Sequence, residues 1–433
     1  MIFTQKCIDE RRIRLQKELQ TILTPGDAVI VFSGHPVVKP GGLDQTYPFL
    51  PHPMYYWLSG SRRHGSAVLF SLDEGWKDYQ LPVAKAEVIW EGAILDPSQM
   101  KNTFNLFQDV QQKKFKRLFV LGQPSVEEKE LATVFDSNLS DQVKMCFDRV
   151  RRKKDTEEIH LIKEAARIAQ RGYQHLRRVI RPGLSERDLQ IEYESEVFRS
   201  GAHQMPYDTI VGSGTNAAIL HAIPTSKLIN DGELILIDAG VDLNEYCVDI
   251  TRVFAANGVW DSRQKEIIQI VQMAQTQSIQ ACRHGVQWSH IHHISARTIA
   301  DGLKSLGLMK GSVDDLLESG AIGLFFPHGV GHMVGLRVRD VGYEENKNPV
   351  KHCGVFLRVD MEIQENHLLT VEPGCYFIRA LLEDPEMKQK YKDQVNWTEV
   401  EKWMSFGGVR IEDNILITMA DPINLTAGVE KAF

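Results

Sequence analysis

The segment from Leu234 to Phe254, with the sequence LILIDAGVDLNEYCVDITRVF, constrains the fold more than any other part of this chain. Its two ends have strand character and the residues between them favour a turn, so the segment predicts a β-hairpin. Asp238 and Asp249 lie inside the predicted strands, where carboxylates are unusual. A turn centred between Leu243 and Asn244 would place the two acids directly opposite each other.

The pairing of these two acids needs an explanation, because like charges that face each other across two strands destabilise a sheet. Burying both charges unpaired costs still more free energy. A cation bound between Asp238 and Asp249 would remove both penalties. A strand-end acid and an unrelated surface acid remain the alternative on the hairpin alone, so more ligands are needed to decide.

The composition excludes several classes of protein. A chain of 433 residues exceeds the size at which single cores usually stop growing, which predicts two domains. The net charge of −7 argues against nucleic-acid binding, and the six cysteines show no CxxC spacing. The N-terminus lacks an apolar leader, and no run of about 18 apolar residues predicts a membrane helix. We therefore expect a soluble cytoplasmic protein with neither membrane nor nucleic acid as a partner.

The predicted domains span residues 1–150 and 151–433. Strand-like runs at residues 27–34, 66–72 and 117–122, with helical stretches between them, predict a small α/β domain in the first part. A basic segment then precedes a long helical pattern, and we place the boundary there.

The second domain begins with a helical pattern over residues 156–180 and a further helix capped by Ser185. Residues 205–224 then predict a strand, a glycine-rich turn and a second strand that ends near His221. A later helix contains a group of histidines that includes His292, which we expect on its solvated surface because the spacing does not suit a helical metal pair.

Three motifs downstream of the hairpin supply further candidate ligands. The sequence FFPHGVGHMVGL carries His328 and His332, LLTVEPGCYFI carries Glu372, and GGVRIEDNILIT predicts an alternating strand with Arg410 and Glu412 on one face. Each motif alone has an ordinary structural explanation. Together with the hairpin they supply four carboxylates and one imidazole.

In its IDAG, DITR, HGxGH, TVEPG and GGVRIED motifs, which occur in the family's order, the chain resembles the prolidase and aminopeptidase P group of metallopeptidases. These proteins share the pita-bread fold with methionine aminopeptidase. The resemblance implies that two divalent metal ions are held by Asp238, Asp249, His332, Glu372 and Glu412. It further implies an N-terminal α/β domain, a C-terminal domain with a curved sheet backed by helices, and a homodimer.

Within this group the sequence is most similar to bacterial prolidases, which are Xaa-Pro dipeptidases. That similarity implies that Tyr207, His221 and His328 contact the substrate and that Arg358 binds its carboxylate. Arg339 departs from the pattern, because relatives have a substrate-holding histidine there. A second guanidinium at this position could also bind a carboxylate.

The resemblance also implies roles in catalysis. Glu372 would carry a proton, His221 would stabilise the developing oxyanion, and Arg410 would orient the ligand Glu412. Carboxylates with one imidazole suit hard or borderline divalent cations. Family analogy favours Mn²⁺, with Co²⁺ and Zn²⁺ as alternatives.

These observations favour a dinuclear metal-dependent Xaa-Pro dipeptidase that acts on small peptides with proline at the second position. One alternative is an Xaa-Pro aminopeptidase that acts on longer peptides. Another is a metal-binding but catalytically impaired relative that serves as a binding module. The complete ligand set favours an enzyme, because a binding module has no need to keep five such residues together.

Overall fold

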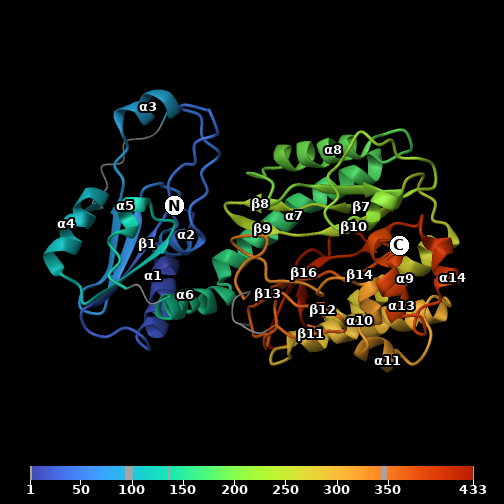
Figure 1. Cartoon of the computed structure of the whole chain (residues 1–433). Coiled ribbons are helices and arrows are strands. Elements are labelled where there is room, and N and C mark those ends of the chain that lie inside the picture. Colours follow the sequence, from blue (N-terminus) through green and yellow to red (C-terminus); the bar gives the residue numbers. More distant parts are fainter. Residues whose placement is uncertain (1, 93–100, 135–136, 343–348, 433) are drawn as a thin grey trace. The chain divides into compact units, whose positions relative to one another are not determined.

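The computed structural model describes the chain except for residues 1, 93–100, 135–136, 343–348 and 433 (Figure 1). The described chain divides into two compact units, Met1–Arg151 and Arg152–Phe433. Both mix helices and strands, as the sequence predicted. No helix in the described part of the chain is long and apolar enough to cross a membrane.

The first unit is built around a five-stranded sheet with the order β4-β3-β2-β1-β5, in which β1 (Asp27–Phe32) is fully buried. Strand β1 runs antiparallel to its neighbour β2 (Ala67–Ser71) and parallel to its other neighbour β5 (Arg117–Gly122). These three strands confirm the strand-like runs that the sequence predicted. The other two strands are β3 (Gly75–Gln80) and β4 (Lys101–Asn102). The helices are α1 (Gln5–Leu19), α2 (Pro53–Ser59), α3 (Lys85–Glu91), α4 (Thr103–Lys113), α5 (Val126–Lys129) and α6 (Ser137–Arg152).

The second unit begins with two helices that cover small antiparallel sheets (Figure 1). The helices start at capping boxes formed by Asp155 with Glu158 and by Ser185 with Asp188, which satisfy backbone N–H groups of the first turn. They are α7 (Thr156–Val179) and α8 (Glu186–Arg199). The following elements are β6 (Ile210–Ser213), the 3₁₀ helix η1 (Gly214–Ala218), β7 (Leu234–Asp238), β8 (Val241–Leu243), β9 (Tyr246–Val248) and β10 (Thr251–Ala255).

The predicted hairpin is present, but its register differs from the one expected. Asp238 pairs with Thr251, and Leu243 pairs with Tyr246, so the turn consists of Asn244 and Glu245. Both turn residues have positive φ angles, of 55° and 71°, which a two-residue hairpin turn of this type requires. Asp249 therefore lies at the break between β9 and β10 instead of directly opposite Asp238.

Among the described residues, the rest of the second unit contains three further small sheets, with β13, β14 and β15 packed against α9 and β11 packed against α10 (Figure 1). In these sheets β11 pairs with β12, β13 with β16, β16 with β17, and β14 with β15. The helices are α9 (Ser262–Ala281), α10 (Trp288–Ser305), α11 (Val313–Glu318), α12 (Arg379–Leu382), α13 (Pro385–Lys390) and α14 (Trp397–Val400), with the 3₁₀ helices η2 (Ala321–Leu324) and η3 (Glu401–Trp403). The strands are β11 (Lys351–His352), β12 (Val355–Phe356), β13 (Leu368–Val371), β14 (Gly374–Tyr376), β15 (Gly408–Arg410), β16 (Asp413–Leu416) and β17 (Ile423–Asn424).

Besides the hairpin register, three local predictions in this unit were wrong. The strand expected to end near His221 is replaced by η1 and a loop. The continuous strand expected around Glu412 is interrupted there, because β15 and β16 pair with different strands. His292 is fully buried in α10, where its ring lies 5.2 Å from that of Phe326, and is not on a solvated surface.

Candidate metal centre

Four carboxylates reach one cavity because each comes from a place where a strand ends or changes its partner. Asp238 is the last residue of β7, Asp249 separates β9 from β10, Glu372 follows β13, and Glu412 separates β15 from β16. A cavity of about 100 Å³ is lined by all four. The same cavity is also lined by His221, His328, His332, Arg339, Arg358 and Arg410. Every predicted site residue except Tyr207 therefore lies around it.

Three of the predicted ligands form a tight group. One ligand atom each of Asp249, His332 and Glu412 lies within 4.8 Å of the others. The Nδ1–H of His332 donates to the carbonyl of Met333 at 3.1 Å, so Nε2 is the ring nitrogen that faces the carboxylates. This Nε2 lies 3.4 Å from Asp249 Oδ2 and 3.7 Å from Glu372 Oε1.

The environment of Glu412 fits a cation. Its side chain is buried, Oε2 accepts a hydrogen bond from the Thr251 hydroxyl at 2.7 Å, and Oε1 has no hydrogen-bond partner among the described residues. Burial, together with the charges of Asp249 and Glu372, raises the pKa of Glu412 well above its usual value. Leaving an acceptor buried and unpaired is costly, and a divalent cation would remove both the unpaired oxygen and the repulsion. The residues present therefore fit a metal site.

Asp238 is held by two side chains. Its Oδ1 accepts from the Tyr207 hydroxyl at 2.7 Å and its Oδ2 accepts from Arg410 Nη2 at 2.6 Å. The Tyr207 hydroxyl also lies 2.6 Å from Asp249 Oδ1, so one phenol connects both acids of the hairpin. Burial and the nearby charge of Asp249 raise the pKa of Asp238 to about 7. Burial also opposes ionisation of Asp249, but the hydrogen bond with His332 holds the pKa of Asp249 below its usual value.

The sequence predicted that Arg410 and Glu412 lie on one face of a strand and that Arg410 orients Glu412. In the structure, Arg410 does not contact Glu412 directly. Its Nη2 pairs with Asp238, while its Nε donates to Thr251 Oγ1 at 3.0 Å, and that hydroxyl donates to Glu412. Its Nη1 donates to the Tyr376 hydroxyl at 2.9 Å. The partners differ from the prediction because the strand breaks between the two residues, so they do not share one face of a continuous strand.

His328 is fixed by bonds at both ring nitrogens. Nδ1 donates to the Gly329 carbonyl at 2.8 Å, and Nε2 accepts from the Tyr376 hydroxyl at 2.9 Å. Burial, followed by the charge of Arg410, lowers the pKa of His328 to about 3. The imidazole is therefore neutral, and it lies beside Glu372 with 3.8 Å between Nδ1 and Oε2.

His221 and Arg339 lie beside each other on the rim of the cavity. Arg339 Nη2 is 3.4 Å from His221 Nε2. Burial, followed by the charge of Arg339, lowers the pKa of His221, so its imidazole is neutral near pH 7. A guanidinium can only donate, so His221 Nε2 acts as the acceptor in this contact.

A larger cavity of about 660 Å³ adjoins the metal centre and shares His221, Arg339 and the two hairpin acids with it. Tyr207 lines this cavity and not the smaller one. Its other apolar lining includes Ile210, Ile223, Pro224 and Val338, and Arg187 contributes a further positive charge.

The loop that carries His221 is anchored by a residue that the sequence analysis missed. The Glu186 carboxylate is fully buried and accepts hydrogen bonds from Ser213, Asn216 and Thr225, at 2.8 to 3.0 Å for their side chains. In the sequence Glu186 looks like an ordinary acid in the first turn of a helix. Its partners lie 27 to 39 residues away, so no local pattern reveals them.

Known proteins are similar to this chain along most of its length. The model of metallopeptidase family M24 matches residues 160–419, and that of the aminopeptidase P N-terminal domain matches residues 8–120. A probable Xaa-Pro aminopeptidase of Sclerotinia sclerotiorum is 30% identical over 397 residues, which cover 89% of this chain and 72% of that protein. One of Aspergillus fumigatus is also 30% identical, over 92% of this chain and 87% of its own length.

Solved structures have the same fold. Aminopeptidase P of Escherichia coli with the inhibitor Pro-Leu is 26% identical, with a TM-score of 0.77 over 97% of this chain and 96% of that one. Proline aminopeptidase P II of Yersinia pestis is 24% identical, with a TM-score of 0.79 over 99% of this chain and 97% of that one.

Proposed function

This chain belongs to metallopeptidase family M24, and we propose that it is an Xaa-Pro aminopeptidase, which hydrolyses the bond between the first residue of a peptide and a proline in the second position. The observation that carries the proposal is the extent of the similarity. Relatives named probable Xaa-Pro aminopeptidases align over 72% to 91% of their own length, and the N-terminal unit matches the aminopeptidase P domain as well. These findings favour the alternative over the dipeptidase that the sequence analysis placed first.

The proposed metal ligands are Asp238, Asp249, His332, Glu372 and Glu412. The Nε2 of His332, which faces Asp249 and Glu372, and the oxygen of Glu412 that has no hydrogen-bond partner among the described residues support this assignment. Two divalent cations, for which we propose Mn²⁺, would supply Lewis acidity toward the peptide carbonyl and would acidify the attacking water.

The side chains around these ligands have distinct proposed roles. Glu372 is the proposed proton carrier: burial raises the pKa of its carboxyl, and its side chain is 17% exposed to the cavity. His221, neutral and on the rim, would contact the substrate carbonyl. Arg410 and Tyr207 would hold Asp238 in place through their hydrogen bonds.

The larger cavity supports action on peptides longer than two residues. Its volume of about 660 Å³ lies directly beside the hairpin acids and offers apolar lining for a peptide chain. The dipeptidase alternative rests on Arg339 and Arg358, two guanidinium groups around the smaller cavity that could bind the carboxylate of a dipeptide.

The test compares Ala-Pro-Ala with Ala-Pro, before and after addition of Mn²⁺ to metal-free protein. We expect release of free alanine from the tripeptide, dependent on Mn²⁺ and faster than release from the dipeptide. Exclusive cleavage of Ala-Pro would instead identify a dipeptidase. Failure to cleave either peptide with Mn²⁺ bound would identify a binding module.

We also propose that the protein is a cytoplasmic homodimer, by analogy with the family it resembles. Light scattering combined with size-exclusion chromatography would decide the oligomeric state.

A further inference from the structure

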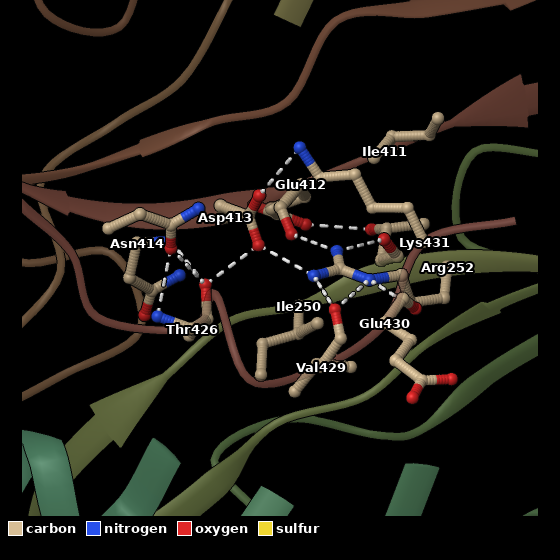
Figure 2. Close-up of polar contacts among 12 residues, drawn as sticks. Ile250, Arg252, Ile411, Glu412, Asp413, Asn414, Thr426, Val429, Glu430 and Lys431 are labelled. Carbon is tan, nitrogen blue, oxygen red and sulfur yellow. Dashed lines mark hydrogen bonds and ion pairs between the residues drawn. The ribbon is translucent and has the colours of Figure 1, made fainter. Parts of the chain in front are cut away.

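A buried ion pair lies directly behind the proposed metal ligands. Arg252 follows Thr251 in β10, and its Nη2 donates to Asp413 Oδ1 at 2.6 Å (Figure 2). Both side chains are at most 1% exposed. Burying two charges costs several kcal/mol per ion unless further hydrogen bonds satisfy the remaining donors and acceptors. The positions of those other bonds therefore indicate what the pair holds.

The remaining N–H groups of Arg252 point at carbonyls on two sides of the guanidinium. Nη1 donates to Glu412 O at 2.6 Å and to Thr251 O at 2.9 Å. Nη2 donates to Val429 O at 2.8 Å, and Nε donates to the carbonyls of Val429 and Glu430 at 3.1 and 3.2 Å. Figure 2 shows this guanidinium between the C-terminal segment and the backbone of Glu412.

Asp413, the residue after Glu412, is fixed at both carboxylate oxygens. Oδ1 also accepts from the Thr426 hydroxyl at 2.8 Å, and Oδ2 accepts from Gln275 Nε2 at 3.1 Å. Lys431 Nζ lies 3.4 Å from Oδ2. The backbone on either side of the Glu412 side chain is thus tied to the C-terminal segment.

The same cluster reaches a second proposed ligand through Asn414. The Asn414 side chain accepts from Asp249 N at 3.1 Å and donates to Asp249 O. The Asn414 backbone N–H in turn donates to Thr426 Oγ1 at 3.0 Å. The backbones of Asp249 and Glu412, which are far apart in sequence, are therefore held by one buried set of hydrogen bonds.

We propose that Arg252 and Asp413 are positioning residues that hold Glu412 and Asp249 at the spacing a divalent cation requires, and so set the affinity of the site for metal. A buried ion pair is by itself weak support for a role in stability. Here the donors are aimed at the backbone of a ligand, which is the arrangement that orients metal sites from outside. The inference rests on the proposed function only in requiring that the site binds metal.

The test is a calorimetric titration of metal-free protein with Mn²⁺. Arg252→Lys keeps a positive charge for Asp413, but a single ammonium cannot reproduce a planar fork that reaches four carbonyls. Loss of such outer contacts typically weakens metal binding about 10- to 100-fold, and we expect a rise in Kd of that size. Asp413→Asn keeps an oxygen that accepts from Arg252 and Thr426, and we expect it to raise the Kd for Mn²⁺ as well. If Arg252→Lys does not fold, the Kd of Asp413→Asn tests the proposal.

Arg177→Met is the matched control. Arg177 Nη2 also binds the C-terminal segment, donating to the carbonyls of Glu430 and Lys431 at 3.2 and 3.0 Å, but from a side chain that is 41% exposed. This variant should loosen the segment while leaving the Kd for Mn²⁺ within about twofold of wild type.

The melting temperature of each metal-free variant separates positioning from folding. A lower melting temperature for Arg252→Lys or Asp413→Asn with an unchanged Kd would mean that the pair serves folding alone, and the proposal would be overturned. An equal rise in Kd for Arg177→Met would overturn it as well. Absence of Mn²⁺ binding by the wild type would instead refute the metal site itself, which is a separate outcome.

Discussion

At the scale of single residues, Asp249 and Glu412 test the ligand assignment most directly. We expect Asp249→Ala and Glu412→Ala each to abolish peptide hydrolysis while the protein stays folded. Losing several kcal/mol of transition-state stabilisation corresponds to a fall in kcat/KM of roughly 10²- to 10³-fold or more. Without metal, Glu412→Ala should melt no lower than metal-free wild type, because it removes one member of a group of repelling buried carboxylates.

Asp242→Asn is the control for this prediction. Asp242 is a buried carboxylate of the same hairpin that accepts hydrogen bonds from Gln204 and Glu245, and it lines neither cavity. Its substitution should leave kcat/KM close to that of wild type. Near-normal turnover by Asp249→Ala or Glu412→Ala would show that the ligand assignment is wrong.

Arg339 carries the second prediction at this scale. Its guanidinium donates to His221 Nε2, and it is permanently charged, so it cannot carry protons as an imidazole can. What it can do is bind an anion beside Arg358. If the dipeptidase alternative holds, we expect the wild type to cleave Ala-Pro slowly but in preference to Ala-Pro-amide, and Arg339→His to raise kcat on Ala-Pro, as measured by release of free alanine.

Arg339→Ala separates the two possible roles of this residue. If Arg339 binds the substrate carboxylate, the alanine variant loses the preference for Ala-Pro over its amide without gaining turnover. If the side chain only points to solvent, both substitutions leave kcat and the ratio of the two substrates unchanged.

The sequence predicted those residues of the metal centre that stand in recognisable motifs, but it did not predict the contacts between them. Asp249, His332 and Glu412 each stand in a recognisable motif, and the structure brings them together. The bridging position of Tyr207 and the link through Thr251 could not be predicted. They depend on contacts between segments 31 to 161 residues apart, for which local patterns give no signal.

At the scale of elements, the hairpin was predictable but its register was not. Asn244 tolerates a positive φ, whereas Glu245 has no such preference and is held there by a hydrogen bond from its N–H to Asp242 Oδ1 at 2.9 Å. The strand break before Glu412 was equally hidden, because alternation in the sequence does not show that a strand changes its pairing partner. These breaks matter, because they direct the acids into one cavity.

Helix α10 provides a prediction about pH. His292 is buried, and burial lowers its pKa from 6.5 to about 3. Below pH 6.5 the unfolded chain therefore binds a proton that the folded chain does not. The stability associated with the neutral ring is complete above pH 6.5 and falls as pH decreases, by up to about 1.4 kcal/mol per pH unit.

His292→Phe should remove this dependence, because a phenyl ring fills a similar volume and does not titrate. We expect the free energy of unfolding of the variant, measured with urea and without metal, to exceed that of wild type increasingly between pH 6.5 and 5. Curves that stay parallel over this range would contradict the assignment of a neutral buried imidazole.

At the scale of the whole molecule, length predicted two domains, and strand-like runs separated by helical stretches predicted that the first domain mixes helices and strands. Only the resemblance predicted that small sheets covered by helices form the second unit. Short strands that change their pairing partners show little hydrophobic periodicity in the sequence. Independent folding of residues 1–150 and 151–433 remains a proposal. Limited proteolysis of the full chain would test it, with cleavage expected near the boundary.

Metal binding is expected to stabilise the native protein as a whole. A ligand that binds only the folded state adds about 2.7 kcal/mol at a free concentration of 100 times its Kd, which corresponds to a rise in melting temperature of roughly 3 to 5 °C for a folding unit of about 280 to 430 residues. A chelator should therefore lower the melting temperature of the protein, and Mn²⁺ should restore it. Glu412→Ala should show a much smaller response to Mn²⁺, because the buried oxygen that lacks a partner is gone. If wild type melts at the same temperature with and without Mn²⁺, the four carboxylates do not hold a metal ion, and their proximity would need another explanation.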